Sequence, residues 1–130
     1  MLCKVMIKGA YDAEEVSSDG ELIFVDNGFD LSYHIAGDNC ILSARGSTVT
    51  QSRRGNFNTD ITFVKGKNTV CMLLSGELTG SVPVKTTALD ISCGEKRVAV
   101  TMEYFLGGSK IYLSLKAVAA DVNRFEEGVK

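Results

Sequence analysis

The sequence has no tryptophan, one proline and one histidine among its 130 residues. A lone imidazole, His34, without clustered thiols excludes the sites that zinc and iron usually require, so we expect no metal. The 14 basic and 16 acidic residues give a net charge of −2, without the basic excess that binds nucleic acid or anionic membranes. No apolar run approaches the roughly 20 residues needed to span a bilayer, so we expect no membrane partner.

The four cysteines lie far apart and form no Cys-x-x-Cys pair. Cys3, Cys40 and Cys71 stand in apolar, strand-like surroundings, where thiols behave as small hydrophobic groups. The amino terminus has lysines among its apolar residues, and it lacks the apolar core and cleavage site of a signal peptide. We therefore expect a cytoplasmic protein with reduced thiols.

The segment 55–91 shows the clearest periodicity. Phe57, Ile61 and Phe63 alternate with polar residues, which is the two-residue period of a strand with one buried face. Glycines mark each reversal of the chain in this segment, because glycine enters positive φ without steric cost. The pattern predicts a β-meander.

The flanking segments repeat this rhythm. Asp26-Asn27-Gly28 is a strong hairpin signal, since Asn-Gly supplies a left-handed pair, and the segment 37–39 also has turn composition. A change of parity in the strand after residue 82 predicts a bulge between Lys85 and Ala88. The other expected strands span residues 3–8, 22–25, 29–35, 40–45, 48–54, 98–106 and 111–117.

These elements predict an all-β fold. Because an open sheet would leave long edges, closure is favoured, and regular hairpins indicate a single antiparallel up-and-down β-barrel of about 8–10 strands. We expect residues 1–120 to form this domain and 121–130 to be a C-terminal tail, where helical spacing of apolar residues predicts a short helix. The expected core consists of Val5, Ile7, Leu22, Phe29, Leu31, Ile61, Phe63, Val98, Val100, Leu113 and Leu115.

The segment 48–54 is unusual for a strand, since Val49 is its only aliphatic residue. If Gln51 and Arg53 point inward with Val49, the lumen has a cationic, hydrogen-bonding patch suited to a carboxylate or phosphate. With the opposite parity, Arg54 points inward instead. An exposed strand with its arginines over the barrel rim is the favoured interpretation, because surface arginines are far commoner than lumenal ones.

Motifs for metal binding and catalysis are weak or absent. Residues 15–26 have the oxygen spacing of a calcium loop, but their flanks have strand patterns, so a solvated acidic turn is favoured over a metal site. The acidic segment 12–20 itself is interpreted either as a loop or as the weak start of the strand that continues through Leu22 to Val25. His34 has the outward parity of its strand, which predicts a surface histidine. Serine-hydrolase, phosphate-loop and dinucleotide-binding patterns are missing. We expect neither enzyme activity nor a cofactor.

An ordered set of short signatures runs along the chain: Val16 to Leu22, Asp26 to Tyr33, Arg53 to Gly55, Ile61 to Lys67 and Gly80 to Thr87. In these, and in two later strands up to about Ala120, the sequence resembles the YwiB-like proteins, small bacterial proteins of uncharacterised function. The resemblance implies a calycin (lipocalin-like) β-barrel with a cavity, but no catalytic residues. The longer loop that family members carry after Tyr33 is missing here.

Two functions compete at this stage. The leading hypothesis is a non-enzymatic barrel that binds a small, partly apolar or anionic ligand. The alternative is a structural or protein-interaction module with a filled barrel, whose outward Tyr112, Phe105 and Val64 form a patch for homo-oligomers. A salt bridge to Asp60 on the adjoining strand would give a lumenal arginine a structural role. The candidate ligand-binding residues are Tyr33, Gln51, Arg53, Arg54, Lys85, Thr87 and Tyr104.

Overall fold

The computed structural model describes residues 1–9, 15–75 and 78–120. The predicted helix in the tail, residues 121–130, lies outside this part of the chain. Among the described residues, none forms a helix of the length and apolarity that crossing a membrane requires. The strands are β1 (Leu2–Gly9), β2 (Glu15–Val25), β3 (Gly28–Ile35), β4 (Asp38–Arg45), β5 (Thr48–Arg54), β6 (Thr59–Val64), β7 (Asn68–Ser75), β8 (Leu78–Cys93), β9 (Arg97–Leu106) and β10 (Ser109–Ala119).

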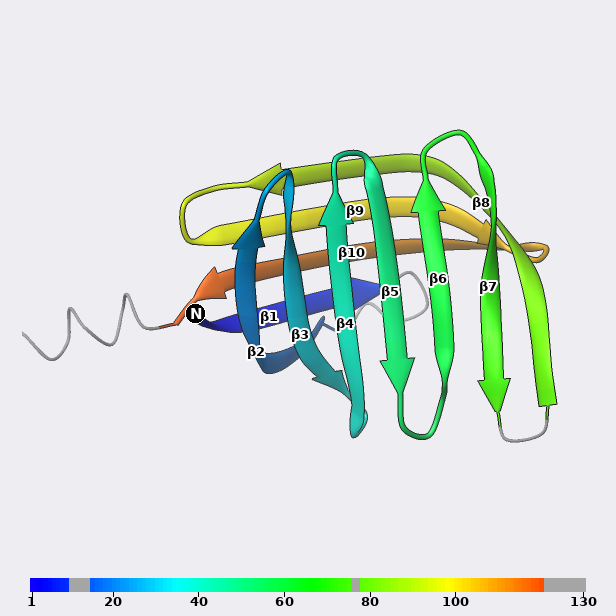
Figure 1. Ribbon diagram of the computed structural model, residues 1–130, viewed down its shortest axis with the longest axis horizontal. Helices are drawn as coiled ribbons and strands as arrows, with labels where there is room; N and C mark the ends of the chain where they lie inside the picture. Colours follow the sequence, from blue (N-terminus) through cyan, green and yellow to red (C-terminus); the bar gives the residue numbers. More distant parts are fainter. Residues whose placement is uncertain (10–14, 76–77, 121–130) are drawn as a thin grey trace, which may run out of the picture.

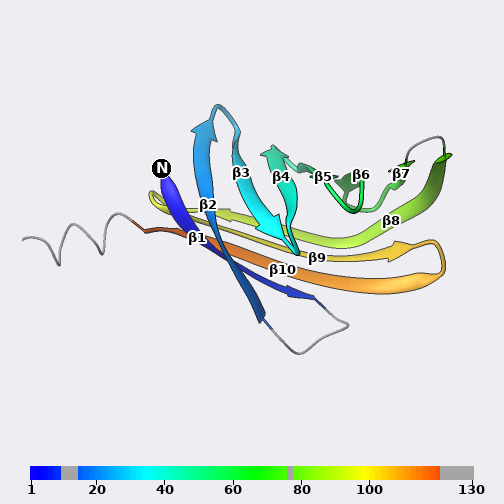
Figure 2. The same cartoon turned by 90° about the horizontal axis from the view of Figure 1, so that it is seen from below.

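The ten strands form a closed antiparallel barrel in which each strand pairs with its neighbours in sequence. β1 and β10 close it, with a ladder that runs from Cys3 opposite Ala119 to Gly9 opposite Leu113. Strands β2 to β7 run across strands β8 to β10 (Figure 1), and the two groups face each other across the interior (Figure 2). The prediction of an all-β, up-and-down barrel is confirmed, and closure leaves no strand at an edge.

The β2–β3 hairpin forms where the Asn-Gly pair predicts it, although the two residues do not both take the left-handed conformation. Asn27 alone takes the left-handed conformation, with φ 66°. Gly28 already belongs to β3, and a Cβ atom there would collide with the backbone carbonyl of Ala44 on β4. Glycine is therefore required at this position for the close approach of two strands.

The predicted bulge in β8 is confirmed, since the register with β9 shifts between Thr86 and Ala88. Before the bulge Val84 and Thr86 face the interior, and after it Leu89 does so. The extra residue keeps apolar side chains inside along a 16-residue strand whose parity changes midway.

Alternating inward side chains form the core of the barrel. Nine of the eleven predicted core residues are buried, whereas Ile61 and Leu113 are partly buried and pack against the others. Phe63 and Tyr104 make an edge-to-face contact from opposite walls, with ring centroids 4.7 Å apart and planes at 60°. The core further includes Tyr33, Leu42, Ala44, Val49, Val84, Met102 and Ala117.

The segment with calcium-loop spacing forms strand β2 from Glu15 onward, so the strand alternative is confirmed for these residues and the solvated turn was wrong. Residues Glu15 to Glu21 pair with β1 without interruption, from Lys8 opposite Glu15 to Leu2 opposite Glu21. Within the described residues, no three His, Cys, Asp or Glu side chains gather closely enough to hold a metal ion.

Candidate functional site

The polar strand β5 lies between β4 and β6, and two of its polar side chains point into the barrel. Val49 is fully buried, and Gln51 and Arg53 share its parity and are partly buried, while Arg54 is exposed. The favoured interpretation, in which both arginines lie outside, was therefore wrong for Arg53. Val49 is buried on the inner face, and Gln51 and Arg53 follow it because side chains two positions apart on a strand lie on the same face.

Gln51 and Tyr33 form a hydrogen-bonded pair inside the barrel. The Gln51 Nε2 amide donates to the Tyr33 hydroxyl oxygen over 2.8 Å, and Tyr33 is only 2% exposed. Burial raises the pKa of the Tyr33 hydroxyl well above its ordinary value, so this group stays protonated. Since its oxygen accepts from Gln51, its own proton can be donated to another acceptor.

Arg53 has a buried carboxylate partner, Asp38 at the start of β4. The Arg53 Nε donates to Asp38 Oδ2 over 2.8 Å. The backbone amides of Asn56 and Phe57 also donate to this carboxylate, at 2.6 Å and 3.2 Å. The amide of Asn56 foremost, and then Arg53, hold the pKa of Asp38 below its usual range. The carboxylate therefore stays ionised and fixes the loop after β5.

The salt bridge to Asp60 that would give an inward arginine a structural role does not form, and Asp38 pairs with Arg53 instead. Asp60 lies opposite Ser52, an outward position, and it pairs with Arg54 on the outer surface at 2.9 Å. Asp38 reaches Arg53 because the β3–β4 turn and the β5–β6 loop lie at the same end of the barrel. The sequence signal was a turn-like aspartate in the segment 37–39, which is usually a solvated residue.

Gly55 allows this approach of the loop to Asp38. Its φ is 148°, a conformation that other residues rarely adopt, and a Cβ atom would collide with the Asp38 carboxylate. Two residues later, the exposed ring of Phe57 lies against the Arg53 guanidinium, with 5.0 Å from Cζ to the ring centroid. Asp38 of β4 and Phe57 of the loop thus both contact the Arg53 guanidinium.

One edge of the Arg53 guanidinium is left without a protein partner. Its Nε donates to Asp38, but neither Nη group donates a hydrogen bond to any acceptor in the described part of the chain. The Arg53 side chain retains 24% of its exposure, whereas that of Asp38 retains 1%. The Nη edge is therefore the accessible part of the pair, and two parallel N–H groups match the geometry of a carboxylate or phosphate.

Three of the sequence-predicted site residues lie outside the barrel. Arg54 and Lys85 are exposed, and Thr87 is exposed with its Oγ1 donating to the backbone carbonyl of Glu103 over 3.1 Å. The bulge explains the placement of Thr87, because it moves the neighbouring Thr86 to the inner face. These three side chains cannot contact a ligand in the lumen.

The structure adds Thr86 to the lumenal set that sequence reasoning named. Thr86 is fully buried, lies opposite Tyr104 on β9, and its Oγ1 has no hydrogen-bond partner. Tyr104 is itself buried, at 6% exposure, beside Phe63. Continuing the alternation of Val82 and Val84 by one step would have identified Thr86 from the sequence.

The thiols do not form a reactive site. All four cysteines are free; Cys3, Cys40 and Cys71 are buried and Cys93 is exposed. Burial raises the pKa of the three inner thiols above the ordinary value, which disfavours the thiolate. Their surroundings agree with the prediction that they behave as small hydrophobic groups.

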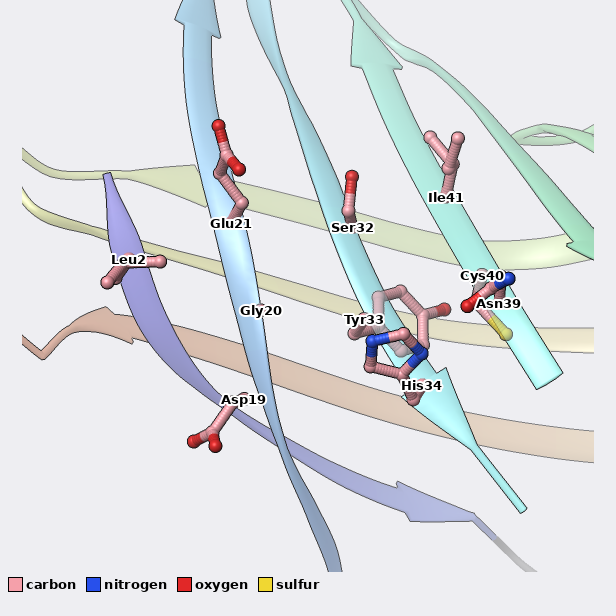
Figure 3. Close-up of a pocket in the computed structure, with 10 residues that line it drawn as sticks. All are labelled: Leu2, Asp19, Gly20, Glu21, Ser32, Tyr33, His34, Asn39, Cys40 and Ile41. Atoms are coloured by element: carbon pink, nitrogen blue, oxygen red, sulfur yellow. The ribbon is translucent and has the colours of Figure 1, made fainter. Parts of the chain in front are cut away.

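A depression on the outer surface, across β2, β3 and β4, has a volume of about 620 Å³. Glu21, Ser32 and Ile41 stand side by side on its floor (Figure 3), and Asp19 and the exposed His34 flank it. Its charged groups are freely solvated: the Asp19 side chain is 93% exposed and meets only Lys4, at 3.4 Å. Apart from Tyr33 and Cys40, the polar side chains that line it among the described residues are exposed, so we take the inward polar side chains of β5 as the better candidate site.

The predicted outer apolar patch is divided by charges. Tyr112 is 46% exposed, and Phe105 on the next strand is partly buried. Tyr112 lies opposite Glu103 and Phe105 lies opposite Lys110, and these two charged residues form an ion pair at 3.3 Å. The third residue, Val64, lies on β6. These three side chains do not build a continuous apolar surface.

Comparison with known proteins agrees with this architecture. No curated protein matches the chain. Among solved structures, the chain is similar to the crystal structure of the ywiB protein from Bacillus subtilis, with a TM-score of 0.75 and 17% identity over 92% of this chain and 90% of that one. At this identity the likeness concerns the fold. Residues 4–114 match the family described as a domain of unknown function, DUF1934, and the chain belongs to this family.

Proposed function

We propose that the barrel is a non-enzymatic binding protein that takes a small molecule with an anionic head and an apolar body into its lumen. The observation that carries the proposal is the free Nη edge of Arg53. Asp38 and Phe57 hold the guanidinium in place, so little conformational entropy is lost when an anion binds. Gln51 and Tyr33 supply hydrogen bonds on the same inner face.

The apolar body of the ligand has a matching surface. Several aliphatic side chains that pack against the core are only partly buried, and we propose that the apolar body of the ligand contacts residues of this kind. They belong to strands on both sides of the barrel: Ile61, Val82, Leu106, Ile111 and Leu113. A mixed lining of this kind, with few polar groups among many apolar ones, is typical of small-molecule sites.

The same chemistry argues for binding rather than catalysis. Asp38 already accepts three hydrogen bonds and has a lowered pKa, which makes it a poor base. Tyr33 has a raised pKa and the inner cysteines are thiols, so the lumen holds no activated nucleophile. Three free buried thiols also support the proposal of a cytoplasmic location.

The test uses octanoate, whose carboxylate and seven-carbon chain match the proposed site, in isothermal titration with the full-length protein. We compare two neighbouring substitutions, Arg53→Lys and Arg54→Lys. Lysine at position 53 keeps a cation beside Asp38 but removes the second N–H of the fork. We expect about tenfold weaker binding for Arg53→Lys, because hydrogen bonds to charged groups contribute about 1.5–3 kcal/mol. Arg54→Lys should bind as the unchanged protein does.

Native mass spectrometry of freshly purified protein provides an independent measurement. The proposal predicts an adduct of small-molecule mass that is depleted in Arg53→Lys and retained in Arg54→Lys. Absence of any adduct together with no octanoate binding would refute the lumenal site and favour the interaction module. The same spectrum reports the oligomer mass that the interaction module predicts.

A further inference from the structure

Although the barrel is closed, β2 pairs with β3 along only its second half. On one side, β2 pairs with β1 from Glu15 to Glu21. On the other side, its ladder with β3 begins at Val25 and ends where Glu21 lies opposite Ser32. Figure 3 shows the two strands diverging beyond this pair, and no strand of the described residues pairs with this side of residues 15–20. The first half of β2 is therefore an open strand edge in the wall of the barrel.

The hydrogen bonds of Leu22 show which backbone groups lie along this edge. The Leu22 amide donates to the Met1 carbonyl, and the amino terminus donates to the Leu22 carbonyl, each over 2.8 Å. In an antiparallel strand both backbone groups of a residue point to the same side, and this side alternates along the strand. Leu22 and the even-numbered residues before it face β1. The backbone groups of Glu15, Ser17 and Asp19 therefore face the open side.

The hydroxyl of Ser18 lies where the two strands separate. It accepts a hydrogen bond from the His34 amide over 3.1 Å and donates one to the Asp19 carbonyl over 2.8 Å. These two backbone groups would meet next if the ladder continued, so a side chain takes the place of one backbone pair. Beyond this point, the amide and carbonyl of Ser17 have no hydrogen-bond partner in the part of the chain that the structure describes. Unpaired backbone groups of this kind allow another strand to be added.

The surroundings of the open edge are acidic. The edge borders the outer depression of about 620 Å³, and no lysine or arginine is among the described residues that line it. The outward side chains of β2 include Glu15, Asp19 and Glu21. Lys4 lies 3.4 Å from Asp19, and within the described residues no other cation forms an ion pair with these three carboxylates. On the opposite face of the strand, Val16 is 48% exposed. The edge thus offers carboxylates on one face and an apolar side chain on the other.

Strand β1 shows which sequence pattern fits these two faces. In its ladder with β2, Lys4 and Lys8 lie opposite Asp19 and Glu15, and the apolar residues of β1 alternate with the two lysines. Opposite charges that lie directly across a ladder stabilise the pairing. A strand on the open side of β2 would meet the same side chains, so the same alternation of basic and apolar residues suits it.

We infer that the open edge of β2 binds an extended peptide segment of a partner protein in which basic and apolar residues alternate. The segment lies antiparallel to β2, in the course that β3 leaves, and pairs with residues 15–19. Its basic side chains face the carboxylates of Glu15 and Asp19, and its apolar side chains lie on the face of Val16. Backbone hydrogen bonds supply the affinity and the alternating side chains supply the specificity. This site is separate from the proposed anion site at Arg53.

The experiment measures binding of a fluorescein-labelled heptapeptide of alternating lysine and valine to the full-length protein by fluorescence anisotropy. Asp19→Lys should weaken binding at least about fivefold, because a like charge then lies across the ladder. Asp90→Lys makes the same change of charge at an exposed position of β8 and should bind as the unchanged protein does. A heptapeptide of alternating glutamate and valine should not bind. No binding to the unchanged protein, or equal weakening by the two substitutions, overturns the inference.

Ser17→Pro separates backbone pairing from the attraction between charges. Proline removes the amide that faces the open side and leaves the ladder with β1 in place, so the unfolding temperature should change little. Binding of the lysine–valine peptide should weaken at least about fivefold, since a backbone hydrogen bond is lost. Ser17→Val changes the side chain alone and should keep the affinity. If Ser17→Pro binds as tightly as Ser17→Val, charge alone holds the peptide and the inference is overturned.

Amide hydrogen exchange tests the open edge without any substitution. In the free protein the Ser17 amide should exchange at least about tenfold faster than the neighbouring Ser18 amide, which faces β1. The lysine–valine peptide should slow exchange at Ser17 and leave Ser18 unchanged. Equal protection of both amides in the free protein would show that another segment or a second copy already covers the edge, and it would overturn the inference.

Discussion

Phe63→Ala tests whether the inner face of β6 is assigned correctly. Phe63 is fully buried and packs edge-to-face on Tyr104, with 4.7 Å between ring centroids. Truncating a buried phenylalanine costs about 3–5 kcal/mol, and loss of an aromatic pair accounts for about 0.5–1.5 kcal/mol beyond area burial. We therefore expect a loss in the upper half of the first range. Urea unfolding followed by circular dichroism measures the free energy of unfolding.

Phe57→Ala is the matched control, since it removes the same ring six residues earlier. Phe57 is 62% exposed, and its contact with the Arg53 guanidinium is an exposed cation–π contact. Contacts of this kind contribute about 0.5–1 kcal/mol, so the control should lose less than about 1 kcal/mol. A loss below about 1 kcal/mol for Phe63→Ala, or equal losses for both variants, would contradict the strand orientation.

Three further predictions concern the loop, its carboxylate and the thiols. Asp38 has a lowered pKa in the folded state, so its contribution to stability is present above the ordinary carboxyl pKa of about 4 and is lost as the pH falls through the folded pKa. Asp38→Asn should therefore weaken the fall of the urea unfolding midpoint at acid pH. An unchanged fall of this midpoint would contradict the assignment. Gly55→Ala combines a strained φ with a collision against Asp38 and should cost about 1–3 kcal/mol, while Gly108→Ala, where no atom lies within reach of a new Cβ, should change stability by less than about 0.5 kcal/mol; equal effects would refute the steric account. Thiol titration should find one fast-reacting group in the native protein, Cys93, and four after unfolding, and fewer than four would indicate a disulfide.

The barrel could be predicted because its determinants are local. The alternation of apolar and polar residues in the sequence shows which face of each strand is buried, and glycine and Asn-Gly mark the turns between strands. Even the bulge in β8 was visible as a change of parity, and the structure places it between Thr86 and Ala88. Closure followed from the number of strands and the cost of open edges, which are properties of the whole chain.

The candidate site was only partly predictable, because a shift of one position along a strand changes which side chain points inward. In β5 a single aliphatic side chain, Val49, decides whether Arg53 or Arg54 points inward. In β8 the exact position of the bulge decides between Thr86 and Thr87. The carboxylate that pairs with Arg53 belongs to Asp38, and the residues that Asp38 contacts lie 15 or more positions away along the chain. Pairings of this range are not encoded in local periodicity.

The inner face of the barrel therefore contains polar side chains that folding alone does not require. Aliphatic residues at the positions of Gln51, Arg53 and Thr86 would close the core without desolvating polar groups. Asp38 offsets the burial of Arg53 only through Nε, and Gln51 and Tyr33 satisfy each other only in part. The Nη edge of Arg53 and the hydroxyl of Thr86 stay unmatched. Natural sequences break local rules mainly at functional sites, and the polar side chains on the inner face of β5 are the clearest break of this kind in the described part of the chain.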